Sequence, residues 1–341
     1  MLHFFYMQKN EALYAIVAGL MQEGKGILAA DESDATAGKR LEIAGLPNQS
    51  GNRQDFREIM FTAPGIEEYM SGVILYDSTI RENTDAGVPF VDVLAARGIV
   101  PGIKVDKGTR ELPGFEGEVV SEGLDELSVR LREYYDLGAR FTKWRAVVNI
   151  TDRIPSDEML RLNATQFAIY ALQVQAAGMV PIVEPEVIFN GKHTIERAEA
   201  VTTRALQILF EVLRMYKVDL RGLILKSSFV LAGSEYPEAS TPEEVAIATM
   251  RTFQLGVPRE VGGIVFLSGG QTSKRSTENL NAIAKIGKQA WPITFSFSRA
   301  LEEPLLTTWQ GKPENIPSAQ KVLLETLHQN SLAQQGKYEA K

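Results

Sequence analysis

The sequence predicts an α/β protein that folds as a single (β/α)8 TIM barrel, with extra helices at its N- and C-terminal ends. One observation is a short aliphatic or β-branched run that recurs eight times along the 341 residues. Another is that these runs are repeatedly followed by longer segments whose apolar residues have helical spacing. No Pro-, Gly- or Ser-rich linker and no charge block divides the chain, so we expect one domain over residues 1–341.

The recurring runs are expected to be parallel strands, because strands covered by helices are apolar along most of their length. In chain order they are residues 26–31 (GILAAD), 72–77 (GVILYD), 101–106 (PGIKVD), 140–149 (RFTKWRAVVN), 179–184 (MVPIVE), 222–226 (GLILK), 263–267 (GIVFL) and 292–297 (PITFSF). A doubly wound open sheet is the alternative fold. Nothing in the chain resembles the G-x-G-x-x-G turn of that fold.

Helical spacing predicts helices between these strands, at residues 125–137, 156–177, 194–216, 241–255 and 276–286. One of them opens with a capping-box pattern. Thr241 supplies the N-cap hydroxyl, Pro242 suits the first helical position, and Glu244 stands at the third.

Two further segments lie outside this alternation of strands and helices. Residues 107–123 are polar and rich in turn residues, which indicates a surface excursion rather than a domain. Residues 317–335 are predicted to form a polar helix, and a short mobile tail is expected from about residue 335.

Composition excludes several classes of function. A net charge of −7 gives no overall attraction to nucleic acid or to anionic membranes. The chain has no Cys and only three dispersed histidines, so we expect no disulfide, no Cys nucleophile and no metal site. No run reaches the roughly 18 apolar residues of a membrane-spanning helix. We therefore expect a soluble protein, and the lack of Cys suits the cytoplasm.

Charged and polar residues gather where the predicted strands end, which is where TIM barrels place their chemistry. Such residues are rarely buried unpaired, so they form either an internal salt-bridge network or an active site. Their convergence from seven strands favours an active site. The residues are Asp31, Lys104, Asp106, Lys143, Arg145, Glu184, Glu186, Lys226, Ser268, Gly269 and Arg299.

Lysine is the only strong candidate nucleophile in this set, because it contains no Cys and no His. Lys226 ends an apolar strand, and Lys143 is available as a neighbouring cation that would favour a neutral amine. For Lys226 taken alone, a structural ion pair with a carboxylate is an equally good interpretation.

Two candidate anion sites flank this lysine. Ser268 and Gly269 follow the seventh strand and Arg299 follows the eighth, the position at which barrels commonly bind phosphate. A second cationic cluster consists of Lys39, Arg40 and Lys104. A tight turn at the first site and a solvated surface at the second are the plainer interpretations.

With these residues identified, the chain resembles the class I, Schiff-base-forming fructose-1,6-bisphosphate aldolases from residue 24 to about residue 338. The matching stretches occur in order at the predicted strand ends. They are GKGILAADES, GIKVDKG, FTKWR, VPIVEPE, ILKSSFV, FLSGGQT, TFSFSRAL and SLAQQGKY.

The resemblance implies that Lys226 attacks the substrate ketone to form an iminium. It implies that Asp31 removes the C4 hydroxyl proton and that Glu184 is the general acid and base, supported by Glu186 and Lys143. The products would be dihydroxyacetone phosphate and glyceraldehyde 3-phosphate, without cofactor or metal. The implied contacts to the phosphate nearest the ketone are Ser268, Gly269 and Arg299. The implied contacts to the rest of the sugar and to its second phosphate are Ser33, Thr36, Lys39, Arg40, Lys104 and Arg145.

The resemblance also implies a homotetramer and a cytoplasmic enzyme, or a plastid one if a transit peptide is removed. Three departures from the family pattern are expected to matter. Ser227 and Ser228 replace a Pro and a small polar residue, and Ser298 replaces a Gly whose backbone would contact phosphate. The chain ends soon after Tyr338, so we expect effects that depend on a longer tail to differ.

Three rival functions stay open at this point. They are another Schiff-base barrel enzyme, such as a transaldolase or a sugar-monophosphate aldolase, a non-catalytic scaffold that binds polyanions or a filament, and a metal-dependent aldolase.

Overall fold

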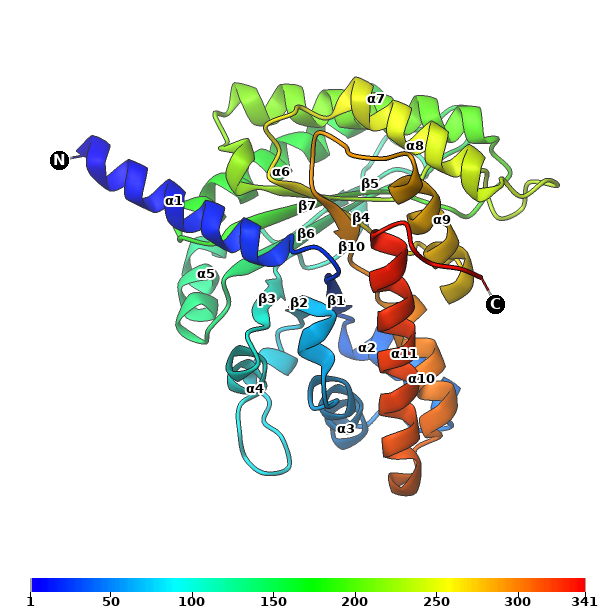
Figure 1. The fold of residues 1–341 in the computed structure, drawn as a ribbon. Helices are drawn as coiled ribbons and strands as arrows, with labels where there is room; N and C mark the ends of the chain where they lie inside the picture. The colour runs from blue at the N-terminus through cyan, green and yellow to red at the C-terminus, as the bar shows by residue number, and fades with distance from the viewer. Residues whose placement is uncertain (1, 341) are drawn as a thin grey trace.

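The eight recurring runs form one parallel sheet in the computed structural model, which describes residues 2–340 (Figure 1). Its strand order is β1-β2-β3-β6-β7-β8-β9-β10, and each neighbouring pair runs parallel. The strands are β1 (Gly26–Ala30), β2 (Met70–Leu75), β3 (Val100–Lys104), β6 (Phe141–Val148), β7 (Val180–Val187), β8 (Ile224–Ser227), β9 (Gly263–Phe266) and β10 (Ile293–Phe295).

The two outer strands of this sheet approach each other. The backbone N–H of Ala29 in β1 donates to the carbonyl of Phe297, just after β10, at 2.9 Å. The sheet is thus nearly closed into a barrel, and the predicted fold class is confirmed. Closure covers the edges that an open sheet would expose.

Helices follow the strands and cover the outside of the sheet (Figure 1). The α-helices are α1 (Leu2–Leu20), α2 (Asp34–Leu41), α3 (Ser50–Phe61), α4 (Phe90–Ala96), α5 (Leu127–Asp136), α6 (Asp157–Ala176), α7 (Ile195–Met215), α8 (Pro242–Gly256), α9 (Ser273–Lys285), α10 (Arg299–Trp309) and α11 (Ile316–Gln334). Short 3₁₀ turns are η1 (Glu42–Ala44), η2 (Ile66–Glu68), η3 (Thr79–Arg81), η4 (Leu220–Gly222) and η5 (Pro313–Asn315).

Most helix boundaries lie within two residues of the predicted ones, and α8 has the predicted capping box. The exception is α9, which begins three residues earlier than predicted. Thr272 is its N-cap, and the Thr272 side chain accepts a hydrogen bond from the Arg275 N–H. The extra terminal helices are α1 and α11, and α11 lies beside α10.

The excursion at residues 107–123 contains a short antiparallel ribbon of β4 (Thr109–Glu111) and β5 (Val119–Ser121). The Ser121 hydroxyl donates to the Arg145 carbonyl at 2.6 Å, so the ribbon is fixed to β6. At the other end of the chain, the Tyr338 backbone exchanges two hydrogen bonds with the Asn281 side chain of α9. The mobility expected of the last residues stays a prediction.

The barrel interior is filled by alternate residues of the strands, since successive side chains of a strand point to opposite faces. Leu13, Val17 and Leu20 of α1 belong to the same cluster and close the end of the barrel where the strands begin. Figure 1 shows α1 running from the N-terminus toward that end. The strand members are Ile27, Ala29, Ile74, Phe141, Val180, Ile182, Ile224 and Val265.

A second and larger core fills the layer between the sheet and the outer helices. It includes Trp144 of β6, whose ring lies 5.4 Å from that of Tyr170 in α6. None of the helices described here combines the length and the apolarity needed to cross a bilayer.

The interior tolerates no side chain at Gly102 of β3. A Cβ added there would lie 2.3 Å from the fully buried ring of Phe141. We expect Gly102→Ala to lower the free energy of unfolding by about 1–3 kcal/mol, the usual cost of overpacking. Urea unfolding followed by circular dichroism measures this change.

Gly51→Ala is the matched control, because Gly51 lies in α3 and a Cβ there meets nothing within 4 Å. It should leave stability unchanged or raise it by up to about 1 kcal/mol. An equal loss in both variants would contradict the packing argument.

Candidate active site

The alternation that fills the barrel with apolar side chains also brings charged ones to its open end. On β6 the inward series Phe141, Lys143, Arg145 changes from apolar to charged toward the carboxyl end of the strand. On β7 the same series passes from Ile182 to Glu184 and on to Glu186, both of which lie within a strand longer than predicted. Lys226 of β8 and Asp31, just after β1, continue this ring.

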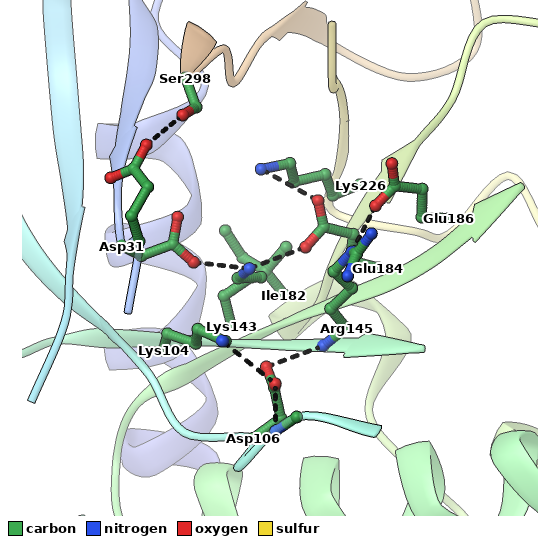
Figure 2. Close-up of polar contacts among 12 residues, drawn as sticks. Asp31, Lys104, Asp106, Lys143, Arg145, Ile182, Glu184, Glu186, Lys226 and Ser298 are labelled. Atoms are coloured by element: carbon green, nitrogen blue, oxygen red, sulfur yellow. Dashed lines mark hydrogen bonds and ion pairs between the residues drawn. The ribbon is translucent and has the colours of Figure 1, made fainter. Parts of the chain in front are cut away.

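Four of these side chains form a continuous chain of charges (Figure 2). Lys226 Nζ lies 3.1 Å from Glu184 Oε1, and Lys143 Nζ lies 2.9 Å from Glu184 Oε2. Lys143 Nζ also lies 2.6 Å from Asp31 Oδ2. Two cations thus alternate with two carboxylates, and Lys143 contacts both carboxylates.

Each member of this chain is at least nine-tenths buried, and at three of them charged neighbours outweigh the effect of burial on the pKa. Burial alone would raise the pKa of Asp31, but the ammonium groups of Lys143 and Lys226 outweigh it and lower the pKa to about 2. The same two cations overcome burial at Glu184 and lower its pKa. Burial would lower the pKa of Lys143, but Asp31 and Glu184 raise it, so Lys143 stays charged.

A second layer of ion pairs surrounds this chain. Lys104 Nζ lies 3.4 Å from Asp106 Oδ1, and Asp106 also accepts the Arg145 backbone N–H at 3.2 Å. The Arg145 guanidinium pairs with Glu186 at short range. The charged residues at the strand ends therefore do form a salt-bridge network, which is one of the two interpretations that the sequence offered.

The network lines an open pocket of about 390 Å³. Three of the residues singled out from the sequence are not among its lining residues: Asp106, which pairs with Lys104, and also Ser33 and Lys39. Ser33 is the N-cap of α2, where it accepts the Thr36 N–H, and Lys39 is exposed on the same helix. The predicted residues that do line the pocket are Asp31, Thr36, Arg40, Lys104, Lys143, Arg145, Glu184, Glu186, Lys226, Ser268, Gly269 and Arg299.

One corner of the pocket has the features of an anion site. Gly269 and Gly270 have φ values of +56° and +88°, which turn the chain sharply after β9. A Cβ at Gly270 would lie 3.9 Å from Arg299 Nη1, so the guanidinium approaches this turn closely. Arg299 also begins α10, and a helix N-terminus favours negative charge.

Sequence reasoning missed three charged residues behind this corner, Glu32, Arg57 and Glu302. Arg57 pairs with Glu32 at 2.6 Å and with Glu302 at 3.2 Å, and all three are buried. They lie in segments far apart in the chain, so their pairing leaves no signal in local spacing.

The three serines that depart from the family pattern all have partners. Ser227 donates to the Ser228 carbonyl, and Ser228 donates to the Val187 carbonyl at 2.9 Å. The Ser298 hydroxyl donates to Glu32 at short range. Between residues 2 and 340, no group of three or more metal-ligating side chains is arranged around a common point.

Comparisons with known proteins agree with this arrangement. The family model "Fructose-bisphosphate aldolase class-I" matches residues 12–341. A probable class 1 fructose-bisphosphate aldolase of Xanthomonas axonopodis pv. citri is 46% identical over 96% of this chain and 98% of that relative. The cytoplasmic isozyme of Cicer arietinum is 46% identical over 98% of this chain and 93% of its own.

A solved fructose-bisphosphate aldolase from Plasmodium falciparum, in complex with TRAP and a small molecule inhibitor, superposes with a TM-score of 0.96. It is 42% identical and covers 98% of this chain and 97% of its own.

The family model and the named relatives place the chain among the metal-independent carbon–carbon lyases. The chain belongs to the class I fructose-bisphosphate aldolase family, which cleaves fructose 1,6-bisphosphate reversibly through a lysine Schiff base. This membership decides against a transaldolase, a metal-dependent aldolase and a scaffold without activity.

The charge on Asp31 can be tested by titration. Because the neighbouring ammonium groups hold its pKa at about 2, the Asp31 carboxyl should stay ionised through the range near pH 3.9 where an ordinary aspartate gains its proton. Its ion pair should therefore contribute stability above about pH 4 and lose this contribution as the pH falls toward 2.

Carboxyl ¹³C NMR, with Asp31→Asn for assignment, measures this pKa. A midpoint at or above 3.9 would mean that burial outweighs the lysines.

Proposed function

We propose that Lys226 is the nucleophile that forms the Schiff base with the ketone of fructose 1,6-bisphosphate. The observation that carries this proposal is the contact between Lys226 Nζ and Glu184, 3.1 Å apart at the open end of the barrel. A lysine must lose a proton before it attacks, and Glu184 is the carboxylate placed to accept it. Lys143, bonded to two carboxylates, is committed to the charged form and cannot take this role.

Glu184 then serves the dehydration step. The neutral amine attacks the ketone carbon and gives a carbinolamine, in which Lys226 no longer carries its charge. Loss of that charge removes one of the two cations that lower the pKa of Glu184, so its affinity for the proton rises. The protonated Glu184 can donate to the departing hydroxyl, and water and the iminium result.

Asp31 is proposed as the base for cleavage. Asp31 takes the C4 hydroxyl proton, and the C3–C4 bond breaks. The electron pair of that bond passes to the iminium, which gives an enamine and glyceraldehyde 3-phosphate. The enamine then gains a proton at C3, which balances the proton taken by Asp31, and addition of water to the resulting iminium releases dihydroxyacetone phosphate and free Lys226. Lys143 holds Asp31 and Glu184 in place, and Glu186, paired with Arg145, supports the proton transfers from the adjacent position on β7.

The two phosphates are proposed to bind at opposite sides of the pocket. Ser268, Gly269 and Arg299 would hold the phosphate nearest the ketone, since this turn and the start of α10 direct donors at one corner. The remaining contacts would come from Thr36, Arg40, Lys104 and Arg145, which line the pocket, and from Ser33 and Lys39 of the α2 segment, which do not line it.

The nucleophile is tested by reducing the Schiff base with borohydride in the presence of dihydroxyacetone phosphate and a chelator. We expect one reduced adduct on Lys226, located by peptide mass mapping, and complete loss of cleavage. Lys226→Met should form no adduct. Lys25→Met is the matched control, because Lys25 precedes β1 at the closed end of the barrel.

An adduct on another lysine would move the nucleophile and overturn the roles given to its neighbours. Absence of any adduct in an enzyme that still cleaves substrate would overturn the Schiff-base assignment for this chain.

The second phosphate site is tested by Lys104→Ala. Loss of one charged hydrogen bond is worth about 1.5–3 kcal/mol, so KM for fructose 1,6-bisphosphate should rise roughly tenfold to a hundredfold. KM for fructose 1-phosphate, which lacks this phosphate, should change much less. Lys107→Ala is the control, since Lys107 is exposed nearby. Equal effects on both substrates would place Lys104 elsewhere in the mechanism.

We also propose that residues 1–341 act as one catalytic domain and that the chain assembles as a homo-oligomer, a homotetramer by family resemblance. Exposed apolar side chains on α7 and α8, Met215, Ile247 and Leu255, support association. The cytoplasm is the proposed compartment, because the relative from Cicer arietinum and a second one from Pisum sativum are named cytoplasmic isozymes.

A further inference from the structure

A buried group of charges lies directly behind the proposed phosphate corner. Glu302 of α10 has no solvent exposure, and Arg57 of α3 is 2% exposed. Arg57 Nη1 lies 3.2 Å from Glu302 Oε1, and Arg57 Nη2 lies 2.6 Å from Glu32 Oε2. One guanidinium is thus shared between two buried carboxyl groups.

The hydrogen bonds of Ser298 indicate that one of these carboxyls carries a proton. The Ser298 hydroxyl has a single hydrogen, which it donates at short range to Glu32. Its oxygen also lies 3.2 Å from Glu302 Oε2. With the hydroxyl hydrogen already committed, this second contact is favourable when Glu302 is protonated and donates.

The surrounding charges assign the proton to the same residue. Burial raises the pKa of Glu302 well above its ordinary value, and the negative charge of Glu32 raises it further. At Glu32 burial also raises the pKa, but Arg57 outweighs it and keeps Glu32 ionised. Two further carboxylates interact electrostatically with this group. The charge of Asp31 acts on Glu32 and Arg57, and the charge of Arg57 acts on Glu82.

This group is connected to the pocket through Arg40 and Ser298. Arg40 Nε of α2 lies 3.6 Å from Glu302 Oε2, and Ser298 immediately precedes Arg299. Arg40, Ser298, Arg299 and Glu32 all line the pocket. With Glu302 protonated, Arg40 and Arg57 face one carboxylate and leave a net positive charge. With Glu302 ionised, the charges of the group cancel.

We propose that Glu302 is a positioning residue that holds a proton behind the phosphate corner, so that binding of a dianion there is coupled to proton uptake. The inference rests on the proposed phosphate site and adds a pH dependence to it. As the pH rises and Glu302 ionises, the corner loses its net positive charge, and Arg40 is drawn toward Glu302 instead of the ligand. A purely structural ion pair would not link anion binding to protons.

The test uses inorganic sulfate, which stays a dianion across the working pH range and so adds no titration of its own. Isothermal titration calorimetry in two buffers with different ionisation enthalpies measures both the Kd for sulfate and the protons taken up. The wild-type enzyme should bind more weakly as the pH rises and take up a fraction of a proton. Each unit by which sulfate raises the pKa of Glu302 corresponds to roughly a tenfold change in Kd.

Glu302→Gln resembles the protonated acid in shape and cannot ionise, so it should remove the proton uptake and flatten the pH dependence of Kd. Glu303→Gln is the matched control, because it removes the same charge from an exposed neighbour on α10. It should behave as the wild type does.

The results that would overturn the inference are distinct from those that affect the phosphate site. Sulfate binding with no proton uptake, or an unchanged pH dependence in Glu302→Gln, overturns the inference alone. Absence of sulfate binding at every pH overturns the phosphate corner as well.

If Glu302→Gln melts at a much lower temperature than the wild type, the infrared spectrum of the wild type tests instead whether Glu302 carries a proton. The carbonyl band of a protonated carboxylic acid should fade with rising pH and return with sulfate. Its absence overturns the inference.

Discussion

The contact on which the site depends is the ammonium of Lys143 held between Asp31 and Glu184. Two carboxylates buried this close together would repel each other, and desolvation would drive both toward protonation. The shared cation, together with Lys226, keeps both ionised, and its two ion pairs hold the carboxylates in place. The proposed base for cleavage and the proposed acid–base for dehydration are therefore charged and oriented before substrate arrives, and Lys226 is left with a single carboxylate partner.

The barrel makes this concentration of charge possible. The same two-residue period that turns Ile182 into the apolar interior turns Glu184 into the pocket one step later along β7. Apolar packing at the end where the strands begin, closed by α1, stabilises the barrel. The charged side chains at the carboxyl ends of the strands stay buried because they form ion pairs. The fold thus separates the part of each strand that stabilises the barrel from the part that carries chemistry.

The strand runs and the charged residues at their ends were predictable because both depend on local sequence. Lys226 and Glu184 end or interrupt apolar runs, and a parallel barrel brings such positions together whatever the helices do. The partners of these residues were less accessible. Arg57 and Glu302 lie on helices whose contacts are decided by tertiary packing. Ser33 caps α2, and the spacing of residues in the sequence does not indicate this direction of its side chain.

The close packing of Gly102 against Phe141 limits how the sequence of such a barrel can evolve. Gly26 and Phe295 form a second pair of the same kind, in which the ring occupies the space that a Cβ would need. In each pair the large residue can shrink first and leave a tolerable void, whereas the small one cannot grow until its neighbour has yielded. The order of substitution is therefore constrained, and the residues at the two positions of each pair should covary among related barrels.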